Sequence, residues 1–238
     1  MAWRSHGTTN VDLIAKMQSN RLIKSDSVAA AFRKVDRANY VLDKAEAYRD
    51  SPQSIKYGAT ISAPHMHAHA TENLLPFLNP GAKVLDVGSG SGYTCAIFYH
   101  LVVGGEGSAD GEASGGKVVG IDHIPQLVDW SVENLRKDGL SDALDSGDIK
   151  MVAGDGRQGW ASEGPYNAIH VGAAAPTMPQ PLIDQLASPG RMFIPVGEHA
   201  QDIIQVDKDS EGRVSEKTLF GVIYVPLTDQ KKQLDNDI

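Results

Sequence analysis

Short apolar runs and longer amphipathic segments alternate along most of the chain. The short runs have the composition of buried strands, and the amphipathic segments place their apolar residues at helical spacing. Predicted strands cover Ala82–Val87, Lys117–Asp122, Ile149–Ala153, Tyr166–Gly172 and Arg191–Val196. Predicted helices cover Tyr93–Val102, Ile124–Lys137 and Pro181–Ala187. Repeated strand–helix pairs indicate an α/β fold with a mainly parallel sheet.

Both ends of the chain add to this repeated pattern. Before the first strand, Val11–Met17 and Val28–Val35 carry apolar residues at helical spacing, so we expect two covering helices. Near the end, apolar runs at Gln201–Asp207 and Thr218–Val225 flank a polar turn and predict a hairpin. The sheet should therefore have an antiparallel edge, and 238 residues suit a single domain.

A glycine-rich turn follows the first predicted strand. Gly88, Gly90 and Gly92 lie where an open α/β sheet forms a crevice for a nucleotide-like ligand. Their spacing is one residue short of a dinucleotide fingerprint, and no Lys followed by Ser or Thr completes a phosphate-binding loop. Asp86 adds negative charge beside the turn. Such a turn suits a cationic adenosine ligand without phosphate, such as S-adenosylmethionine; the alternative is an ordinary strand–turn–helix of an α/β domain.

Acidic residues end the next two strands as well. Asp122 falls where a nucleotide-binding sheet places the carboxylate that accepts hydrogen bonds from ribose hydroxyls. Asp155 follows the third strand and could reach the adenine amino group. Three acids at neighbouring strand ends favour the S-adenosylmethionine interpretation. After the fourth strand, the acid or amide with paired prolines that is typical of enzymes methylating base amino groups is absent from the sequence.

The segment before the first strand carries hydroxyl and imidazole groups. Turn signals predict that Tyr48–Ser62 is irregular and that a helix follows it. A metal site is one hypothesis for His65, His67 and His69, but their alternation by two points them in different directions on a helix, and no cysteine or paired acid is nearby. Ser62 lacks the glycine-flanked turn of a serine hydrolase. We therefore expect no metal, and interpret the histidines as polar residues at a helix start.

Composition narrows the classes of partner. A formal net charge of −8 argues against a phosphate-binding surface, so we expect no nucleic-acid partner. The single cysteine, Cys95, cannot form an internal disulfide, which agrees with a reducing compartment, and we interpret it as a small buried residue. We find neither a signal peptide nor an apolar run long enough for a membrane helix. The expected protein is soluble, cytosolic and monomeric.

Several blocks of the sequence together resemble the protein-L-isoaspartate O-methyltransferase family, and most closely its eukaryotic members. The Ala59–His67 and Ile194–Gly197 blocks are strongly specific, whereas the glycine turn is shared by many methyltransferases. The matching blocks are Asp50–Ile55, Ala59–His67, Leu85–Gly92, Gly120–Ile124, Gly154–Arg157, Ala168–Pro176, Ile194–Gly197 and Gly221–Asp229. The resemblance extends over nearly the whole chain. The stretch Gly104–Gly116 looks longer than is usual in the family.

This resemblance implies a Rossmann-like methyltransferase fold and a protein-repair reaction. A methyl group would pass from S-adenosylmethionine to the α-carboxylate of L-isoaspartyl residues (and to D-aspartyl residues) in damaged proteins and peptides, leaving S-adenosylhomocysteine. Residues 1–62 would then hold the N-terminal helices and the active-site segment, and residues 63–238 the cofactor-binding core and hairpin. The alternatives are an O-methyltransferase for another carboxylate acceptor and a non-catalytic module that binds S-adenosylmethionine or damaged chains.

The resemblance also implies roles for individual residues. Ser62 matches the catalytic position of the family. The implied cofactor contacts come from the active-site segment, the glycine turn, the strand ends and the tail. They are Ala59, Thr60, Ile61, Ser62, His67, Gly88, Ser91, Asp122, Asp155, Gly156, Thr228 and Gln233.

Overall fold

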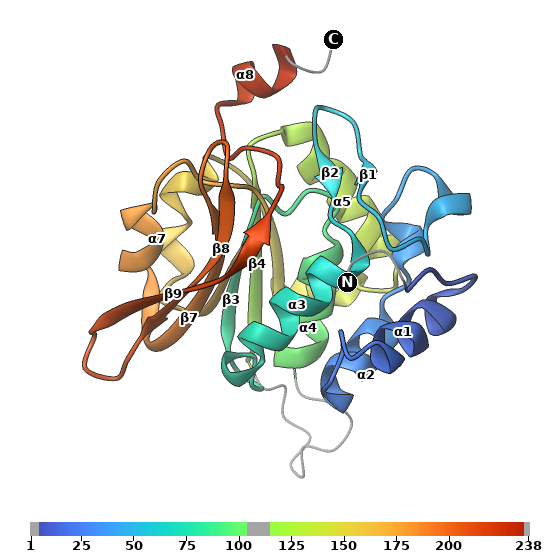
Figure 1. The fold of residues 1–238 in the computed structure, drawn as a ribbon, viewed down its shortest axis with the longest axis horizontal. Coiled ribbons are helices and arrows are strands. Elements are labelled where there is room, and N and C mark those ends of the chain that lie inside the picture. Colours follow the sequence, from blue (N-terminus) through green and yellow to red (C-terminus); the bar gives the residue numbers. More distant parts are fainter. Residues whose placement is uncertain (1–4, 104–114, 236–238) are drawn as a thin grey trace.

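A seven-stranded sheet forms the centre of the protein, in a computed structural model that describes residues 5–103 and 115–235 (Figure 1). Its strand order is β5-β4-β3-β6-β7-β8-β9, and β1 and β2 pair separately. The strands are β1 Gln53–Ser54, β2 Thr60–Ile61, β3 Lys83–Val87, β4 Lys117–Asp122, β5 Ile149–Ala153, β6 Tyr166–Val171, β7 Leu186–Val196, β8 Gln201–Lys208 and β9 Val214–Val222. Strands β3 to β7 pair in parallel, and β8 and β9 add an antiparallel edge. The predicted sheet is therefore confirmed.

Helices cover both faces of this sheet. Helices α3, α4 and α5 lie against one face, α7 lies against the other, and α1 and α2 form an outer layer beside α4 (Figure 1). The α-helices are α1 Asn10–Ser19, α2 Asp26–Lys34, α3 Pro64–Leu74, α4 Tyr93–Val102, α5 Pro125–Lys137, α6 Ser141–Ser146, α7 Gln180–Asp184 and α8 Gln230–Asp235. Short 3-10 turns connect several of them. Within the described part of the chain, none of the helices combines the length and the apolar character needed to cross a bilayer.

The two N-terminal helices form as their sequence predicts and belong to the main core. The Thr9 side chain caps α1 by accepting a hydrogen bond from the Asp12 amide. Asn10 joins the two helices, because its Nδ2 donates to the carbonyls of Phe32 and Val35 at 3.1 and 3.0 Å. Their apolar faces share a buried cluster with α4 and α5 that includes Ile97. The covering helices thereby support the segment that leads into β1 and β2.

Some element bounds differ from the sequence prediction. Strand β9 begins at Val214, directly after the turn, and ends at Val222, whereas the apolar pattern placed it at Thr218–Val225. Polar residues pair there with β8 because β9 is a solvent-exposed edge, where backbone pairing needs no apolar side chains. Residues 223–225 instead leave the sheet, and the Val225 carbonyl accepts a hydrogen bond from Ala174. Strand β7 likewise begins earlier, at Leu186, where it pairs with Tyr166 of β6.

Other segments show structure that the sequence pattern missed. The stretch predicted to be irregular contains the two-residue strands β1 and β2, which pair antiparallel. Their connection has positive φ at Lys56, Tyr57 and Gly58, so turn residues rather than apolar periodicity set this hairpin. Helices α6 and α8 are too short for a clear periodic signal. Most of the Gly104–Gly116 stretch lies outside the described residues.

Replacing Gly120 with alanine should destabilise the centre of the sheet. A methyl group at Gly120 would lie 2.8 Å from Sγ of the buried Cys95 and 2.6 Å from Cε of Met151. Overpacking of this kind costs about 1–3 kcal/mol of the free energy of unfolding, which urea titration measures. Gly221→Ala is the matched control, because Gly221 also lies in a strand and its closest contact would be 3.7 Å. Equal stability of the two variants would show that this part of the sheet is loosely packed.

Candidate functional site

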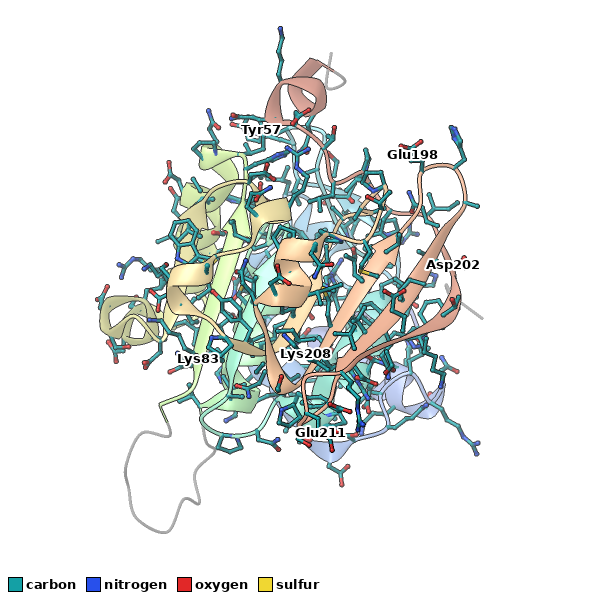
Figure 2. All side chains as sticks on the ribbon, turned by 90° about the vertical axis from the view of Figure 1, so that its left-hand side faces the viewer. Tyr57, Lys83, Glu198, Asp202, Lys208 and Glu211 are labelled. Carbon is teal, nitrogen blue, oxygen red and sulfur yellow. The ribbon has the colours of Figure 1, made fainter. Side chains whose placement is uncertain are left out.

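A narrow cleft lies at the carboxyl ends of the parallel strands. It encloses about 50 Å³ of free space, and about 550 Å³ when the part open to solvent is included. Its walls come from the β2 segment, the strand ends and the C-terminal tail. The lining residues are Ala59, Thr60, Gly88, Gly90, Ile121, Asp122, His123, Asp155, Gly156, Gly172, Ala173, Val225, Pro226, Leu227, Thr228 and Gln233. Figure 2 marks this end of the molecule by Tyr57, opposite Lys83 at the start of β3.

The glycine turn brings main chain to the wall of the cleft. Gly88 and Gly90 have φ of 72° and 49°, which a side chain rarely tolerates. The Gly88 amide donates to the Ile121 carbonyl at 2.9 Å, so the turn is fixed to the end of β4. A Cβ at Gly90 would lie 3.1 Å from Ile55. The turn therefore has both the conformation and the small side chains that a close backbone approach to a ligand requires.

Asp122 combines a structural role with a place in the cleft. Its carboxylate accepts hydrogen bonds from the amides of Gly90 and Ile124, both at 3.0 Å. Burial raises the pKa of Asp122, and these two hydrogen bonds act in the opposite direction. Each carboxylate oxygen can accept a further bond. Asp122 can thus hold the glycine turn and still receive the hydroxyls of a ribose.

Asp155 is the more exposed acid of the cleft. It caps the 3-10 turn Gly156–Gln158 by accepting a hydrogen bond from the Arg157 amide, and it pairs with the Arg157 guanidinium at 2.8 Å. That pairing holds the pKa of Asp155 below its ordinary value, so the group stays ionised. The same guanidinium contacts Asp229 of the tail at 2.7 Å. This chain of charges ties the end of β5 to the C-terminal segment.

Asp86, the acid near the end of β3, does not line the cleft. Asp86 lies within β3, is 1% exposed, and faces its direct cross-strand partner, His170 of β6. Its Oδ1 lies 2.6 Å from His170 Nδ1, and its Oδ2 accepts the Cys95 thiol hydrogen bond at 3.2 Å. Asp86 thus forms no part of the cleft wall, although its nearby charge contributes to raising the pKa of Asp122, which holds the turn. Cys95 is buried, as predicted.

The C-terminal tail closes one side of the cleft. The Leu227 amide donates a hydrogen bond to the carbonyl of Ala174, just beyond β6, and the Ala174 amide donates to the Val225 carbonyl. Further along, the Gln233 side chain donates to the Tyr57 carbonyl at 2.8 Å and its Oε1 lies 2.7 Å from His123 Nε2. In Figure 2, Tyr57 accordingly lies beside α8. The tail thereby links the β6 end to the β1–β2 hairpin across the cleft.

A second cavity, the wide groove, lies beside the narrow cleft and has a volume of about 1210 Å³. Thr60 and Val225 line both cavities, so the two are adjacent. The groove runs between α3 and the antiparallel edge of the sheet. Its lining residues are Asn20, Leu22, Pro52, Thr60, Ser62, Ala63, His65, Met66, His69, Ala200, Gln201, Asp202, Phe220, Gly221, Val222, Ile223, Tyr224 and Val225.

Ser62 lies in the wall of the wide groove and is held from two sides. Its carbonyl accepts a hydrogen bond at 2.8 Å from Arg37, a fully buried arginine that also lies over the Tyr93 ring. Its side chain lies close to that of Tyr224: burial raises the pKa of Tyr224, and the Ser62 side chain acts in the opposite direction. Burial lowers the pKa of Arg37 to about 10, which still leaves the guanidinium charged at neutral pH. The position of Ser62 is thus fixed by a buried cation and a tyrosine.

The sequence-predicted site residues divide between the two cavities and the layer behind them. The narrow cleft contains Ala59, Thr60, Gly88, Asp122, Asp155, Gly156, Thr228 and Gln233. Ser62 lines the wide groove instead. Ile61, His67 and Ser91 are buried and line neither cavity. Their proposed cofactor contacts stay predictions.

His67 forms part of the layer behind the site. Its Nδ1 lies 3.2 Å from the Thr94 hydroxyl, and its ring packs edge-on against Tyr93. Burial, together with the charge of Arg37, lowers the pKa of His67, so the ring is neutral. Its Nε2 has no hydrogen-bond partner among the described residues. A neutral histidine in this place can supply a hydrogen bond but no charge.

Two further features of the site were missed by sequence reasoning. Asp50 lies 2.7 Å from His65, although an acid near the histidines was not expected. The fifteen-residue separation hides this pair, because only the β1–β2 hairpin brings the two together. His123 and Ala173 also line the cleft, each close after a predicted strand. Their position at strand ends was the available signal.

Comparison with known proteins identifies close relatives. The family model described as Protein-L-isoaspartate(D-aspartate) O-methyltransferase (PCMT) matches residues 8–232. The chain is 49% identical over 228 residues to protein-L-isoaspartate O-methyltransferase 1 of Arabidopsis thaliana, covering 96% of this chain and 95% of that protein. It is 46% identical over 235 residues to protein-L-isoaspartate O-methyltransferase of Caenorhabditis elegans, covering 98% of each.

A solved structure adds to this comparison. It is a Plasmodium falciparum protein described as a protein-L-isoaspartate O-methyltransferase in complex with S-adenosyl-L-homocysteine. The two folds superpose with a TM-score of 0.83 at 32% sequence identity, covering 92% of this chain and 98% of that one. The match therefore includes most of this chain.

Proposed function

Because this chain belongs to the protein-L-isoaspartate(D-aspartate) O-methyltransferase family, we propose that it methylates the α-carboxylate of L-isoaspartyl residues, and also D-aspartyl residues, in damaged proteins and peptides. The methyl donor is S-adenosylmethionine, and S-adenosylhomocysteine is the product. Relatives named protein-L-isoaspartate O-methyltransferase support this proposal, and so does a related structure that contains S-adenosylhomocysteine.

The observation that carries the proposal is the contact between two cavities of different character. The narrow cleft holds a glycine turn and two acids, which suit a cationic adenosine compound. The wide groove holds Ser62 and extends along a sheet edge, which suits a length of polypeptide. Since Thr60 lines both, a methyl group held at the end of the cleft would face a carboxylate held beside Ser62.

The cleft fits the cofactor by its chemistry. Asp122 and Asp155 offer carboxylate oxygens for ribose hydroxyls and an adenine amino group, and Gly88 allows the ligand to approach the main chain. The enclosed space of about 50 Å³ is small, whereas ligand pockets typically measure about 300–1,000 Å³. The cofactor must therefore also use the part of the cleft that is open to solvent.

The reaction places modest demands on the protein. A carboxylate is already ionised at neutral pH, so no general base is needed to form the nucleophile. When bound, S-adenosylmethionine supplies an activated methyl group on a sulfonium. The protein has to align the carboxylate with that methyl group and exclude water. Ser62 can donate its hydroxyl proton in a hydrogen bond to one carboxylate oxygen, leaving the other oxygen to attack, and Arg37 and Tyr224 keep Ser62 in place.

The wide groove favours an extended polypeptide over a small acid. Its wall includes Val222 at the end of β9 and residues 223–225, which leave the sheet, and Ile223 is 98% exposed. An exposed apolar side chain along a groove of this length is a contact that a peptide can use and that a small acid cannot. This feature favours a protein substrate over the alternative of another carboxylate acceptor.

Two peptides that differ in one linkage test the proposed function. One contains an L-isoaspartyl residue and the other contains the normal aspartyl residue in the same sequence. With S-adenosylmethionine labelled in its methyl group, we expect a base-labile methyl ester on the isoaspartyl peptide and about background labelling of the normal peptide. Equal labelling of both peptides, or labelling only of free small carboxylic acids, would refute the proposed acceptor.

Gln233→Ala should speed the release of S-adenosylhomocysteine. The substitution removes the contacts of the tail with Tyr57 and His123, and two hydrogen bonds of this kind contribute about 1–2 kcal/mol. We expect a release rate about 5- to 20-fold higher in stopped-flow displacement experiments. Lys231→Ala, on the exposed side of the same helix, should leave the rate unchanged. Equal release rates for both variants would mean that the tail does not retain the cofactor.

We also propose a working environment for the enzyme. A net charge of −8 disfavours nucleic acid as a partner, and one buried cysteine agrees with a reducing cytosol. The proposed substrate is a single damaged chain bound along one groove, for which a monomer suffices. Light scattering of the purified protein would test the monomeric state.

A further inference from the structure

The wide groove must accept a negative charge, yet it offers few positive ones. Under the proposed function, on which this inference rests, an isoaspartyl carboxylate enters the groove. Among the described residues that line it there is no lysine or arginine, and Asp202 adds a negative charge. A carboxylate that leaves water needs hydrogen bonds from charged or well-placed donors. Ser62 supplies one neutral donor, and of the lining residues that the structure describes, only His65 and His69 have side chains that can become cations.

His65 is equipped to carry that charge. Its Nδ1 lies 2.7 Å from Oδ1 of Asp50, a fully buried carboxylate, and the His65 amide donates to the same oxygen at 3.0 Å. Burial alone would raise the pKa of Asp50, but the hydrogen bonds from the His65 ring and amide bring it below its ordinary value. An ionised carboxylate only accepts hydrogen bonds, so Nδ1 of His65 must carry a proton. Any second proton on the ring is then on Nε2.

His69 is less suited to the role. Burial, with the nearby charge of His65, lowers the pKa of His69, which favours the neutral ring. Its ring packs on Phe220, with centroids 5.2 Å apart. Asp50 is a direct partner of His65 and not of His69. Among the described residues, His65 has a hydrogen bond with the buried carboxylate of Asp50, whereas the charge of Asp50 acts on His69 only through space. The two histidines therefore form a matched pair.

We propose that His65, held by Asp50, is the residue that recognises the negative charge of the isoaspartyl carboxylate in the wide groove. The imidazolium of His65 donates a hydrogen bond from Nε2 to the carboxylate, and Asp50 stabilises the imidazolium from the opposite side. Ser62, three residues earlier, lies in the same wall and orients the reacting oxygen. His65 therefore determines acceptor specificity, and Asp50 is its positioning residue.

Several other titratable groups surround His65. Asp50 favours the imidazolium, and its own amide donates to His6 Nδ1 at 3.1 Å. His67 and His69 lie near enough for their charges to interact with that of His65, and both are shifted towards the neutral form. Asp202 lies across the groove.

Binding of two peptides tests the proposal without requiring turnover. The two peptides have the same sequence and both contain an isoaspartyl residue. In one peptide the α-group of that residue is a free carboxylate, and in the other it is a carboxamide. Calorimetry with enzyme saturated with S-adenosylhomocysteine gives the ratio of the two dissociation constants. We expect the wild type to bind the carboxylate peptide about 10-fold or more tightly, as for a hydrogen bond between charged groups. In His65→Gln the ratio should fall to about 1–2, and in His69→Gln it should keep its wild-type value.

The ratio of the two dissociation constants separates recognition of the carboxylate from general effects on folding. A general distortion of the groove would weaken the binding of both peptides equally. A His65→Gln protein that retains the wild-type ratio overturns the proposal. If that variant binds neither peptide, Asp50→Asn decides: a reduced ratio supports the role of the pair, and an unchanged ratio refutes it. Failure of the wild type to methylate the isoaspartyl peptide would instead refute the proposed function, and the two failures are distinct.

Discussion

Asp122→Ala should weaken the binding of S-adenosylmethionine about 100-fold or more. The substitution removes the acceptor for ribose hydroxyls and also leaves the amides of Gly90 and Ile124 without their partner. Hydrogen bonds to a charged group are worth about 1.5–3 kcal/mol each, and loss of about 3 kcal/mol corresponds to a factor of more than 100 in affinity. Calorimetric titration with S-adenosylhomocysteine measures the change.

Asp122→Asn provides the matched control for this prediction. Asparagine keeps one oxygen that can accept from Gly90 or Ile124 but loses the charge, so its affinity should lie between those of wild type and Asp122→Ala. Thermal unfolding of both variants separates loss of the ligand contact from loss of the fold. Unchanged affinity in a folded Asp122→Ala protein would remove Asp122 from the cofactor site.

Ser62→Ala should lower the rate of methyl transfer and leave cofactor affinity almost unchanged, because Ser62 lines the wide groove and not the narrow cleft. Loss of one hydrogen bond to a carboxylate in the transition state costs about 1.5–3 kcal/mol, so kcat should fall by about 10- to 100-fold. Affinity for S-adenosylhomocysteine should stay within about twofold of wild type. Single-turnover methylation of an isoaspartyl peptide and calorimetry give the two quantities.

Ser215→Ala is the comparison variant for Ser62. Ser215 is exposed on β9 and lines neither cavity, so both quantities should match the wild type. If Ser62→Ala lost cofactor affinity while turnover per bound cofactor stayed normal, Ser62 would belong to the cofactor site and not to the reaction. The variants of Asp122 and Ser62 together test whether the narrow cleft binds the cofactor and the wide groove positions the acceptor.

The sequence predicted best those features that local patterns determine. Strands β4 and β5 and helix α4 have the predicted bounds, because continuous apolar runs or helical spacing mark buried elements clearly. The strand-end acids were located correctly along the chain, and Asp122 and Asp155 line the narrow cleft, whereas Asp86 does not. Asp86 faces His170 inside the sheet because the pairing of β3 with β6 places those two residues side by side, and no local pattern shows that register.

The site itself depends on contacts between distant segments. The tail reaches the cleft through the hydrogen bonds of Val225 and Leu227 with Ala174 and of Gln233 with Tyr57, and neither contact follows from a periodic pattern in the sequence. The pairing of Asp50 with His65 depends on the β1–β2 hairpin, which positive φ at Lys56 and Tyr57 makes possible. Sequence resemblance located the residues of the active-site segment, but only the fold separates Thr60, at the junction of the cavities, from the buried His67.

A crystal structure of the protein with S-adenosylhomocysteine and an isoaspartyl peptide would test whether methyl transfer occurs where the narrow cleft meets the wide groove. We expect the adenosine beside Gly88, Asp122 and Asp155, the sulfur next to Thr60, and the peptide carboxylate within hydrogen-bonding distance of Ser62. An adenosine bound away from those residues, or a peptide carboxylate outside the wide groove, would contradict the proposed arrangement.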